Sequence, residues 1–297
     1  MFQNKRILAR CVLFAAAFFW GSSFFIMKNT VDVFPPNYLL AIRFTVASAL
    51  LAVVFHKRLK KIDKSYIRSG FIIGLSLFLG YFFQTYGLEG TTPGKNAFLT
   101  ATYCVIVPFM YWAVDKTKPD AYNLTAAFIC LIGIGFVSIT SSFSMGWGDG
   151  LTILSGVFYA LNMISVSRHS RNLDVIVLTV IQFAFVALFC WIGALLFETW
   201  PAAVSAGSIV SLLYLAVVVT GVAFLFQNLG LKWENPTTAS IILSLESVFG
   251  ILFSILFYGE SVTPRLLLGF VLIFFAVILS ETKLSFLKNR TDEKNLS

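Results

Sequence analysis

Ten separate stretches of 19 to 24 predominantly apolar residues follow one another along this chain of 297 residues. Each is long enough to cross the hydrocarbon core of a bilayer, about 30 Å, as a helix. Helices and closed barrels alone satisfy their backbone hydrogen bonds in lipid, and the alternating ten-residue segments of barrel strands are missing. The sequence therefore predicts an all-α polytopic membrane protein with ten transmembrane helices, at 10–28, 38–56, 67–87, 93–114, 121–140, 148–167, 174–197, 208–231, 236–258 and 263–282.

The composition excludes the main soluble classes. Apolar residues make up 58% of the chain, and Asp, Glu, Lys and Arg together only 12%, against roughly 25% in ordinary soluble domains. Each of the four cysteines, Cys11, Cys104, Cys130 and Cys190, lies within an apolar run, and none belongs to a Cys-x-x-Cys motif or a Cys/His cluster. The sequence thus predicts no metal site, no disulfide framework and no cofactor.

The distribution of positive charge predicts the orientation in the membrane. If the N-terminus is cytoplasmic, the outer segments contain only Lys28, Lys95 and Arg265, whereas the inner segments contain 18 Lys and Arg residues. Cytoplasmic loops carry such an excess in membrane proteins. Both termini are therefore expected in the cytoplasm of a multi-pass protein of the cell membrane. The net charge of +8 is explained by topology, and no nucleic-acid partner is needed.

The chain repeats itself. Residues 82–96 (FFQTYGLEGTTPGKN) align without a gap with residues 225–239 (LFQNLGLKWENPTTA) at an offset of 143, and residues 18–24 (FFWGSSF) align with residues 157–163 (VFYALNM) at an offset of 139. Each half contains five predicted spans, so the second half must be inserted upside down. We expect two inverted five-helix repeats, at 10–140 and 148–282, and a cytoplasmic tail at 283–297. Inverted repeats are typical of secondary transporters.

Several motifs occur in the order and spacing of a known family. They are FFWGSSF (18–24), AIRF (41–44), the Gly-Leu…Pro turn that occurs in both halves, SLESVFG (244–250) and FYGES (257–261). Over residues 10–282 the chain resembles the EamA-type family of the drug/metabolite transporter superfamily. The resemblance implies ten helices, cytoplasmic termini and the transport of small metabolites, often as export.

Five polar or amphipathic residues are predicted to lie in one layer near the middle of the membrane. Glu246 is ten residues into its span, where an ionisable group is costly and often marks a transport pathway. Tyr103 is its repeat partner. Trp20 and Tyr159 are a second pair of repeat partners, and Asn162 lies one turn from Tyr159. We expect these residues to line a substrate site. The alternative is structural: a hydrogen-bonded glutamate that joins helices, and aromatic rings that fill the bundle.

Four further residues are candidates for substrate binding. Arg43 either snorkels to the outer surface or turns inward to bind a carboxylate or phosphate. Its repeat partner is Gln182. Gln84 and Gln227 flank the two repeated turns and either line the pathway or cap helix ends. We also hypothesise that Arg43 and Glu246 interact, directly or through a zwitterionic substrate, in one access state.

These observations favour a secondary transporter that moves small metabolites, amino acids or related compounds, across the cytoplasmic membrane by alternating access, with export as the expected direction. The expected partners are a small-molecule substrate and the lipid bilayer. Energy comes from an ion gradient, with proton coupling through Glu246 as one option, or from the gradient of the substrate. The alternatives are a membrane-embedded enzyme, for which nucleophile and metal motifs are missing, and a non-transporting scaffold. Substrate identity and oligomeric state stay open.

Overall fold

The computed structural model describes the chain apart from residues 1, 92–95, 97–98, 117, 139–144, 259–262 and 283–297. The predicted cytoplasmic tail lies wholly outside the described residues. Every regular element in the described part is helical. The elements are α1 (Phe2–Gly21), α2 (Phe24–Val31), α3 (Pro36–Val54), α4 (His56–Leu59), α5 (Lys64–Glu89), α7 (Tyr103–Asp115), α8 (Ala121–Ser138), α9 (Trp147–His169), α10 (Val175–Phe197), α11 (Ala206–Tyr214), the π-helix η1 (Leu215–Val222), α12 (Ala223–Trp233), α13 (Pro236–Leu243), α14 (Glu246–Tyr258) and α15 (Pro264–Thr282).

Five of the described helices are long and apolar enough to cross a membrane. They are α3, α5, α9, α10 and the continuous helix 206–233 that α11, η1 and α12 form together. The other predicted spans coincide with α1, which begins with several basic residues, with the shorter apolar helices α7, α8 and α15, and with α13 and α14, which divide one span between them. The all-helical class is confirmed, while the count of ten spans stays a prediction.

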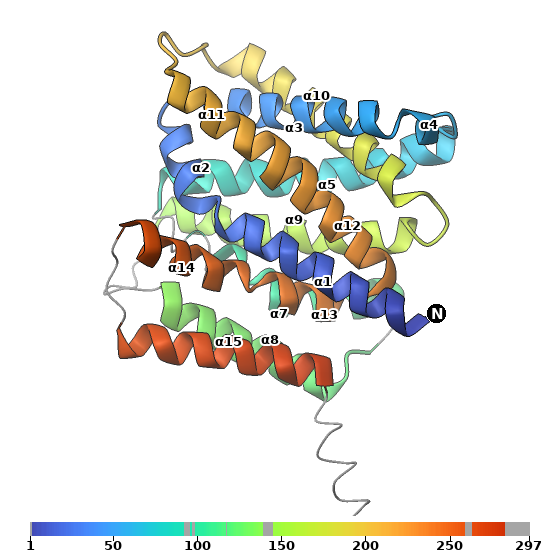
Figure 1. Cartoon of the computed structure of the whole chain (residues 1–297), viewed down its shortest axis with the longest axis vertical. Coiled ribbons are helices and arrows are strands. Elements are labelled where there is room, and N and C mark those ends of the chain that lie inside the picture. The colour runs from blue at the N-terminus through green and yellow to red at the C-terminus, as the bar shows by residue number, and fades with distance from the viewer. Residues whose placement is uncertain are drawn as a thin grey trace, which may run out of the picture.

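The helices form a layered bundle in which most of them run roughly along a common direction (Figure 1). α3 packs on α10 in one outer layer, and α8 packs on α15 in the opposite one. Between them, α5 packs on α9, α12 packs on α1, and α7 packs on α13. Exchanging each helix for its counterpart in the other half leaves the α3–α10 and α8–α15 pairs unchanged and interchanges the α5–α9 and α12–α1 pairs, since α5 corresponds to α12 and α9 to α1.

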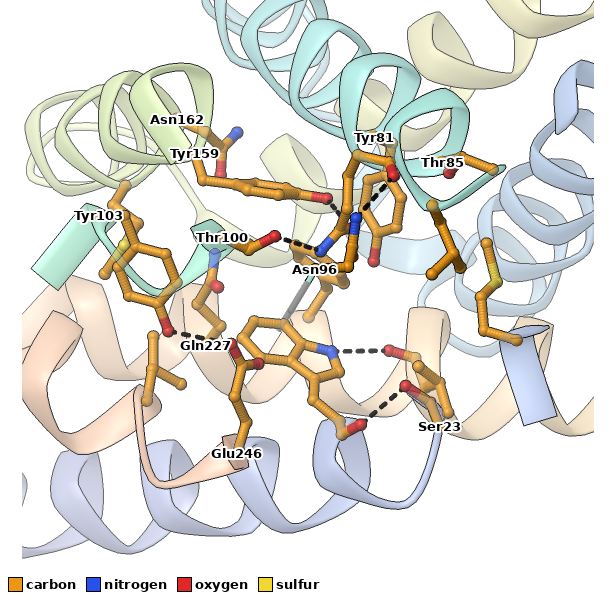
Figure 2. A pocket seen from close by; sticks show the side chains of 18 of the residues that line it. Ser23, Tyr81, Thr85, Asn96, Thr100, Tyr103, Tyr159, Asn162, Gln227 and Glu246 are labelled. Atoms are coloured by element: carbon orange, nitrogen blue, oxygen red, sulfur yellow. Dashed lines mark hydrogen bonds between the residues drawn. The ribbon is translucent and has the colours of Figure 1, made fainter. Parts of the chain in front are cut away.

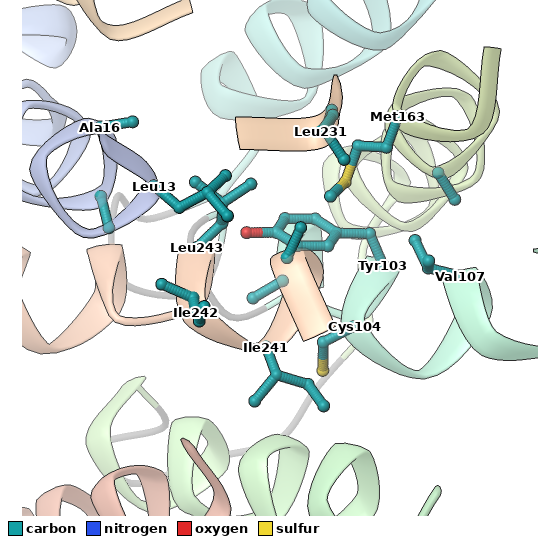
Figure 3. Close-up of a cluster of buried hydrophobic side chains, with 14 of the residues drawn as sticks. Leu13, Ala16, Tyr103, Cys104, Val107, Met163, Leu231, Ile241, Ile242 and Leu243 are labelled. Atoms are coloured by element: carbon teal, nitrogen blue, oxygen red, sulfur yellow. The ribbon is translucent and has the colours of Figure 1, made fainter. Parts of the chain in front are cut away.

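One core region lies where both halves meet. Leu13 of α1, Tyr103 of α7 and Leu243 of α13 are all buried in the same hydrophobic cluster, and Figure 3 shows the ring of Tyr103 among these side chains. Met163 of α9 and Leu231 of α12 complete the contact. The cluster therefore fixes the helices that carry the polar residues described below.

Candidate functional site

Two helices are broken at equivalent positions of the repeat. α13 ends at Leu243 and Glu246 begins α14, while in the first half a turn at residues 101–102 precedes Tyr103, which begins α7. These breaks are separated by the same offset of 143 that relates the two sequences. Such discontinuous helices place polar groups at the centre of many transporters. Each break here presents one of the two central residues that the sequence predicted as partners.

Tyr103 and Glu246 contact each other across the interface between the halves. The Tyr103 hydroxyl donates a hydrogen bond to Oε1 of Glu246, at 3.4 Å, and both side chains are buried. The contact is visible at the edge of a cavity of about 80 Å³ (Figure 2). Side chains from both halves of the chain line this cavity, so it lies between the halves.

Eight of the nine predicted site residues line this one cavity: Trp20, Arg43, Gln84, Tyr103, Tyr159, Asn162, Gln227 and Glu246. The exception is Gln182, which does not line it. Gln182 is fully buried where α10 packs on α5, and neither of its amide atoms has a hydrogen-bond partner. A methyl group at Gly74 of α5 would meet its backbone, which shows how closely these helices approach.

Arg43 points inward and is 2% exposed, so it does not snorkel to the surface. Its Nε and Nη2 donate to the hydroxyl of Thr220, at 3.2 and 3.0 Å, and Nη1 lies 3.1 Å from Sδ of Met27. The guanidinium also lies over the ring of Tyr81, at 5.3 Å. Within the described residues no ion pair joins Arg43 to Glu246, so the direct contact that we hypothesised is not formed in this state.

The π-helix supports this arrangement. Thr220 lies in η1 and its hydroxyl donates to the carbonyl oxygen of Leu215, at 2.8 Å, five residues back along the chain. The oxygen then accepts from Arg43. In the same segment the carbonyl oxygen of Val219 accepts the indole N–H of Trp20, at 3.1 Å. Widened turns of this kind occur often at functional sites. Here the turn holds two of the predicted site residues.

Amide and hydroxyl groups of α5 and its neighbours form a network on one side of the cavity. Oε1 of Gln84 accepts from the hydroxyl of Tyr159, at 2.7 Å, and Nε2 of Gln84 donates to Thr100, at 3.1 Å. Asn96 donates to the backbone oxygen of Gln84 and to the hydroxyl of Thr152. Gln84 is therefore a cavity-lining residue in the middle of a network, and not a cap of a helix end.

Asn162 and Gln227 use their amides for local contacts. Nδ2 of Asn162 donates to the carbonyl oxygen of Ile73, at 3.0 Å, and so joins α9 to α5. Nε2 of Gln227 lies 3.5 Å from Oδ1 of its neighbour Asn228. Both residues line the cavity but direct donors to the protein itself. They shape the cavity wall more than they offer free groups to a ligand.

Sequence reasoning missed several lining residues. Tyr81, Thr85 and Leu88 lie on the same face of α5 as Gln84, at spacings of three and four residues, and all of them line the cavity. The hydroxyl of Thr85 is buried without a hydrogen-bond partner. Tyr81 packs edge-on against Tyr159, with ring centroids 5.6 Å apart. Helical spacing from Gln84 is the signal that identifies this face.

Equivalent contacts close the two ends of the bundle. At the end that holds the start of α1, called the Arg10 end, Nε of Arg10 lies 3.0 Å from Oε2 of Glu234. At the opposite end, called the Asp149 end, the Thr91 hydroxyl donates to Oδ1 of Asp149, at 2.7 Å. The repeat offset of 139 maps Arg10 onto Asp149 at the opposite end, and the offset of 143 maps Thr91 onto Glu234. The same pair of positions therefore makes both contacts.

A second ion pair lies near the Arg10 end. Nη2 of Arg171, just after α9, lies 2.9 Å from Oδ2 of Asp115, the last residue of α7. Hydrogen bonds from Arg171 hold the pKa of the Asp115 carboxyl below its usual range. The carboxylate form is thereby favoured, and the pair ties α7 to the end of α9.

Comparison with known proteins identifies the class to which this architecture belongs. The sequence profile of the EamA-like transporter family matches residues 7–139 and again residues 146–282. The chain belongs to this family. An uncharacterized transporter of Archaeoglobus fulgidus is 33% identical over 275 residues, which cover 93% of this chain and 86% of the relative. The uncharacterized transporter YoaV of Bacillus subtilis is 24% identical over 263 residues, 86% of this chain and 90% of the relative.

A solved crystal structure shares the fold. It has a TM-score of 0.80 and 17% sequence identity, and the match covers 94% of this chain and 98% of that chain. The family and its transporter relatives, together with the apolar helices, make this a multi-pass membrane protein of a transporter family.

Proposed function

We propose that the protein is a secondary transporter that exports small zwitterionic metabolites, amino acids or related compounds, across the cytoplasmic membrane by alternating access. The observation that carries this proposal is the contact between Tyr103 and Glu246. Repeat partners, each at the start of a broken helix, meet at a buried cavity between the two halves. This arrangement is typical of transporters built from inverted repeats.

The architecture in this proposal is ten spans in two inverted repeats, with both termini in the cytoplasm. Three observations support it. The family profile matches twice, once in each half. The α3–α10 and α8–α15 pairs are unchanged, and the α5–α9 and α12–α1 pairs are interchanged, when the halves are exchanged. The helix breaks before Tyr103 and Glu246, and the end contacts of Arg10 and Asp149, occur at the offsets of the sequence repeat.

The substrate class follows from the charges in the cavity. Arg43 offers a guanidinium whose present partners, a threonine hydroxyl and a thioether, are weaker acceptors than a carboxylate. Glu246 offers a buried carboxylate with one tyrosine partner. A zwitterion would place its carboxylate at Arg43 and its ammonium at Glu246, with its side chain among Trp20, Tyr81 and Tyr159. The cost of two buried charges is then offset by the substrate itself.

The cavity must expand to admit such a molecule. Its volume of about 80 Å³ is well below the roughly 300–1,000 Å³ of ordinary ligand pockets. The contacts at the Arg10 end and at the Asp149 end are both formed in this state. In the proposed cycle one of them breaks while the other holds, so that the cavity opens to one side at a time. We assign the Arg10 end to the cytoplasm, as the distribution of positive charge indicates.

Energy coupling belongs to Glu246 in this proposal. When the ammonium of the substrate leaves, a carboxylate remains in the middle of the bundle, where an uncompensated charge is costly. A proton that binds there neutralises it. Exchange of substrate for a proton at one carboxylate would couple export to the proton gradient.

The test begins with untargeted metabolite profiling of cells that overproduce or lack the protein. The best candidate is then measured as flux in proteoliposomes with the purified full-length chain. Glu246→Gln should abolish flux, whereas Asp32→Asn, which alters an exposed carboxylate outside the cavity, should leave it intact. Flux of every candidate equal to that of protein-free liposomes would refute the transporter. Wild-type flux in Glu246→Gln would refute both roles assigned to this residue.

A further inference from the structure

A cluster of six basic residues surrounds the start of α5. It consists of Lys57, Arg58, Lys60, Lys61, Lys64 and Arg68, all of them exposed. Arg58 forms an ion pair with Asp174, at 3.1 Å. Asp63, the one acid within the cluster, accepts hydrogen bonds from the backbone of Ser65 and Tyr66 as the N-cap of α5. Within the described part of the chain the other five cations have no acidic partner, so the cluster attracts anions.

An apolar groove lies directly beside two of these cations. Ile62, Ile67, Phe71 and Phe185 form most of its wall, with Lys64, Arg68 and the N-cap Asp63 as its polar residues, and its volume is about 460 Å³. Ile67 is 45% exposed and Phe71 43%. On α5, Lys64, Arg68 and Phe71 are spaced by four and three residues, so they follow one another down a single helix face. The groove therefore has a cationic rim and an apolar floor.

The groove is a stable feature of the packing between α5 and α10. A methyl group at Gly70 would meet Ile181, and one at Gly74 would meet Phe185, so the two helices touch at these glycines. Phe71 packs edge-on against Phe185, with ring centroids 5.4 Å apart, and lies 6.0 Å from Phe189. The aromatic floor is thus held by contacts within the protein and needs no ligand to form.

We infer that this groove binds one anionic phospholipid. The phosphate lies between Lys64 and Arg68, and an acyl chain lies along Ile67 and Phe71 toward Phe185. Basic side chains at the cytoplasmic ends of membrane helices attract anionic head groups, each contributing about 1 kcal/mol near the surface. A free anion would leave the apolar floor uncovered, and a zwitterionic lipid would bring its own cation to the basic rim. An anionic lipid covers the apolar floor with its acyl chain and places only negative charge at the basic rim.

The second half of the chain contains an internal comparison. The N-cap of α5 is Asp63 and the N-cap of α11 is Ser205, and the offset between them is one residue smaller than the offset of 143 that applies downstream of η1. A widened π turn contains one extra residue, and η1 lies between these two regions, so the difference of one is expected. At this smaller offset Ile67 and Phe71 correspond to Ile209 and Leu213, which are both 47% exposed. Lys64 and Arg68 correspond to Ala206 and Val210. The counterpart keeps the apolar face and has no cation, so it offers no head-group site.

This inference requires that α5 and α10 span the membrane, and it is independent of the proposed transport. The test uses the full-length protein purified in mixed micelles with equal amounts of phosphatidylglycerol and phosphatidylcholine. Native mass spectrometry counts the lipids that stay bound. The wild type should retain phosphatidylglycerol preferentially. In Lys64→Gln with Arg68→Gln the ratio of phosphatidylglycerol to phosphatidylcholine should fall about 30-fold.

The matched control is Lys57→Gln with Lys60→Gln, which removes two cations of the same cluster away from the groove and should change the ratio less than about twofold. Charge-conserving Lys64→Arg with Arg68→Lys should bind as the wild type does, and thermal unfolding checks that all variants are folded. Excess glycerol 3-phosphate, a head group without acyl chains, should not displace the lipid. An unchanged ratio in the groove variant, an equal loss in the control, or displacement by glycerol 3-phosphate would each overturn the inference.

Discussion

At the two ends of the bundle, matched positions of the repeat form contacts with different chemistry. At the Arg10 end the contact is an ion pair, with the Arg10 side chain 38% exposed and that of Glu234 7%. At the Asp149 end the corresponding contact is a hydrogen bond from a neutral threonine to a carboxylate. The backbone arrangement is shared, but charge is present on both partners at one end only. The matched positions of the two halves thus make a contact at each end and differ in the charge of the side chains that form it.

The centre of the molecule differs in the same way. Glu246 faces its repeat partner Tyr103, and Arg43 lines the cavity while its partner Gln182 is buried outside it. Every charge that the cavity presents therefore comes from one member of a repeat pair. In the proposed cycle, the symmetry of the halves provides the two access states, and their asymmetry provides the charges that bind substrate. Each prediction below alters matched positions of the two halves and compares the results.

The largest effect expected is a difference in sidedness between matched loops. Lys60 and Ala203 lie in corresponding loops of the two halves, before α5 and before α11. In intact cells a membrane-impermeant thiol reagent should label Ala203→Cys and should not label Lys60→Cys until the membrane is permeabilised. The reason is that, in the proposed architecture, five spans separate these equivalent positions, so they lie on opposite sides of the membrane. Labelling of both positions from outside would contradict the inverted arrangement.

Next in size is the effect of the two residues at the helix breaks. Glu246→Gln should reduce flux of a zwitterionic substrate at least about 100-fold. The ammonium of the substrate then loses its carboxylate partner, and a buried charge without a partner costs several kcal/mol. Tyr103→Phe removes only one hydrogen bond, worth about 1 kcal/mol, and should reduce flux roughly fivefold. Initial rates in proteoliposomes across pH measure both. Equal losses in the two variants would remove the special role of the carboxylate.

Much of this comparison was accessible from the sequence. The two repeat offsets paired Tyr103 with Glu246 and Trp20 with Tyr159, and depth along each apolar run placed them in one layer. Eight of nine predicted residues line the cavity because depth and repeat register are properties of the sequence itself. Family membership was predicted from the motifs and is confirmed.

The rest depended on tertiary packing. α10 is apolar around its whole circumference, so no periodicity indicated that Gln182 is buried in the packing of α10 and does not line the cavity. The break at Ser244 and the π-helix at η1 lie within continuous apolar runs that have no proline at either irregularity, so their local sequence favours an uninterrupted helix. Thr220, whose hydroxyl accepts hydrogen bonds from Arg43, lies in that π-helix, and the sequence analysis did not predict it as a site residue.

A third prediction separates Arg43 from Gln182. Arg43→Gln should raise KM for a carboxylate-bearing substrate about tenfold to 100-fold, as expected for loss of a charged hydrogen bond of roughly 1.5–3 kcal/mol. Gln182→Leu should leave KM unchanged and raise the thermal unfolding temperature, because both amide atoms of Gln182 are buried without partners. Concentration-dependent flux and thermal unfolding of the purified variants give both readouts. A loss of transport in Gln182→Leu alone would reverse the assignment.

A smaller effect is expected at the aromatic pair. Trp20→Ala and Tyr159→Ala each remove one wall of the cavity, and each should weaken substrate binding about threefold to tenfold while folded protein is retained. Tyr159→Phe, which keeps the ring and loses only the hydrogen bond to Gln84, should bind more tightly than Tyr159→Ala. Binding measured by ligand-dependent thermal protection, together with flux, tests this. Unchanged flux in both alanine variants would assign these rings to packing.

The smallest effect belongs to the end contacts, because exposed ion pairs and single hydrogen bonds contribute only about 1 kcal/mol each. The reporter is Thr85→Cys, a buried position that lines the cavity, in a chain whose exposed Cys11 is replaced by Ala. Arg10→Gln should favour opening at the Arg10 end and raise labelling from that side about fivefold. Thr91→Val should raise labelling from the opposite side by a similar factor.

Salt should weaken only the ion pair, so about 1 M salt should raise labelling of the reporter protein without either of these two substitutions from the Arg10 side alone. If both variants open the same side, or if salt acts equally on both, then these matched contacts do not hold the two ends closed, and the asymmetry between them has no part in access.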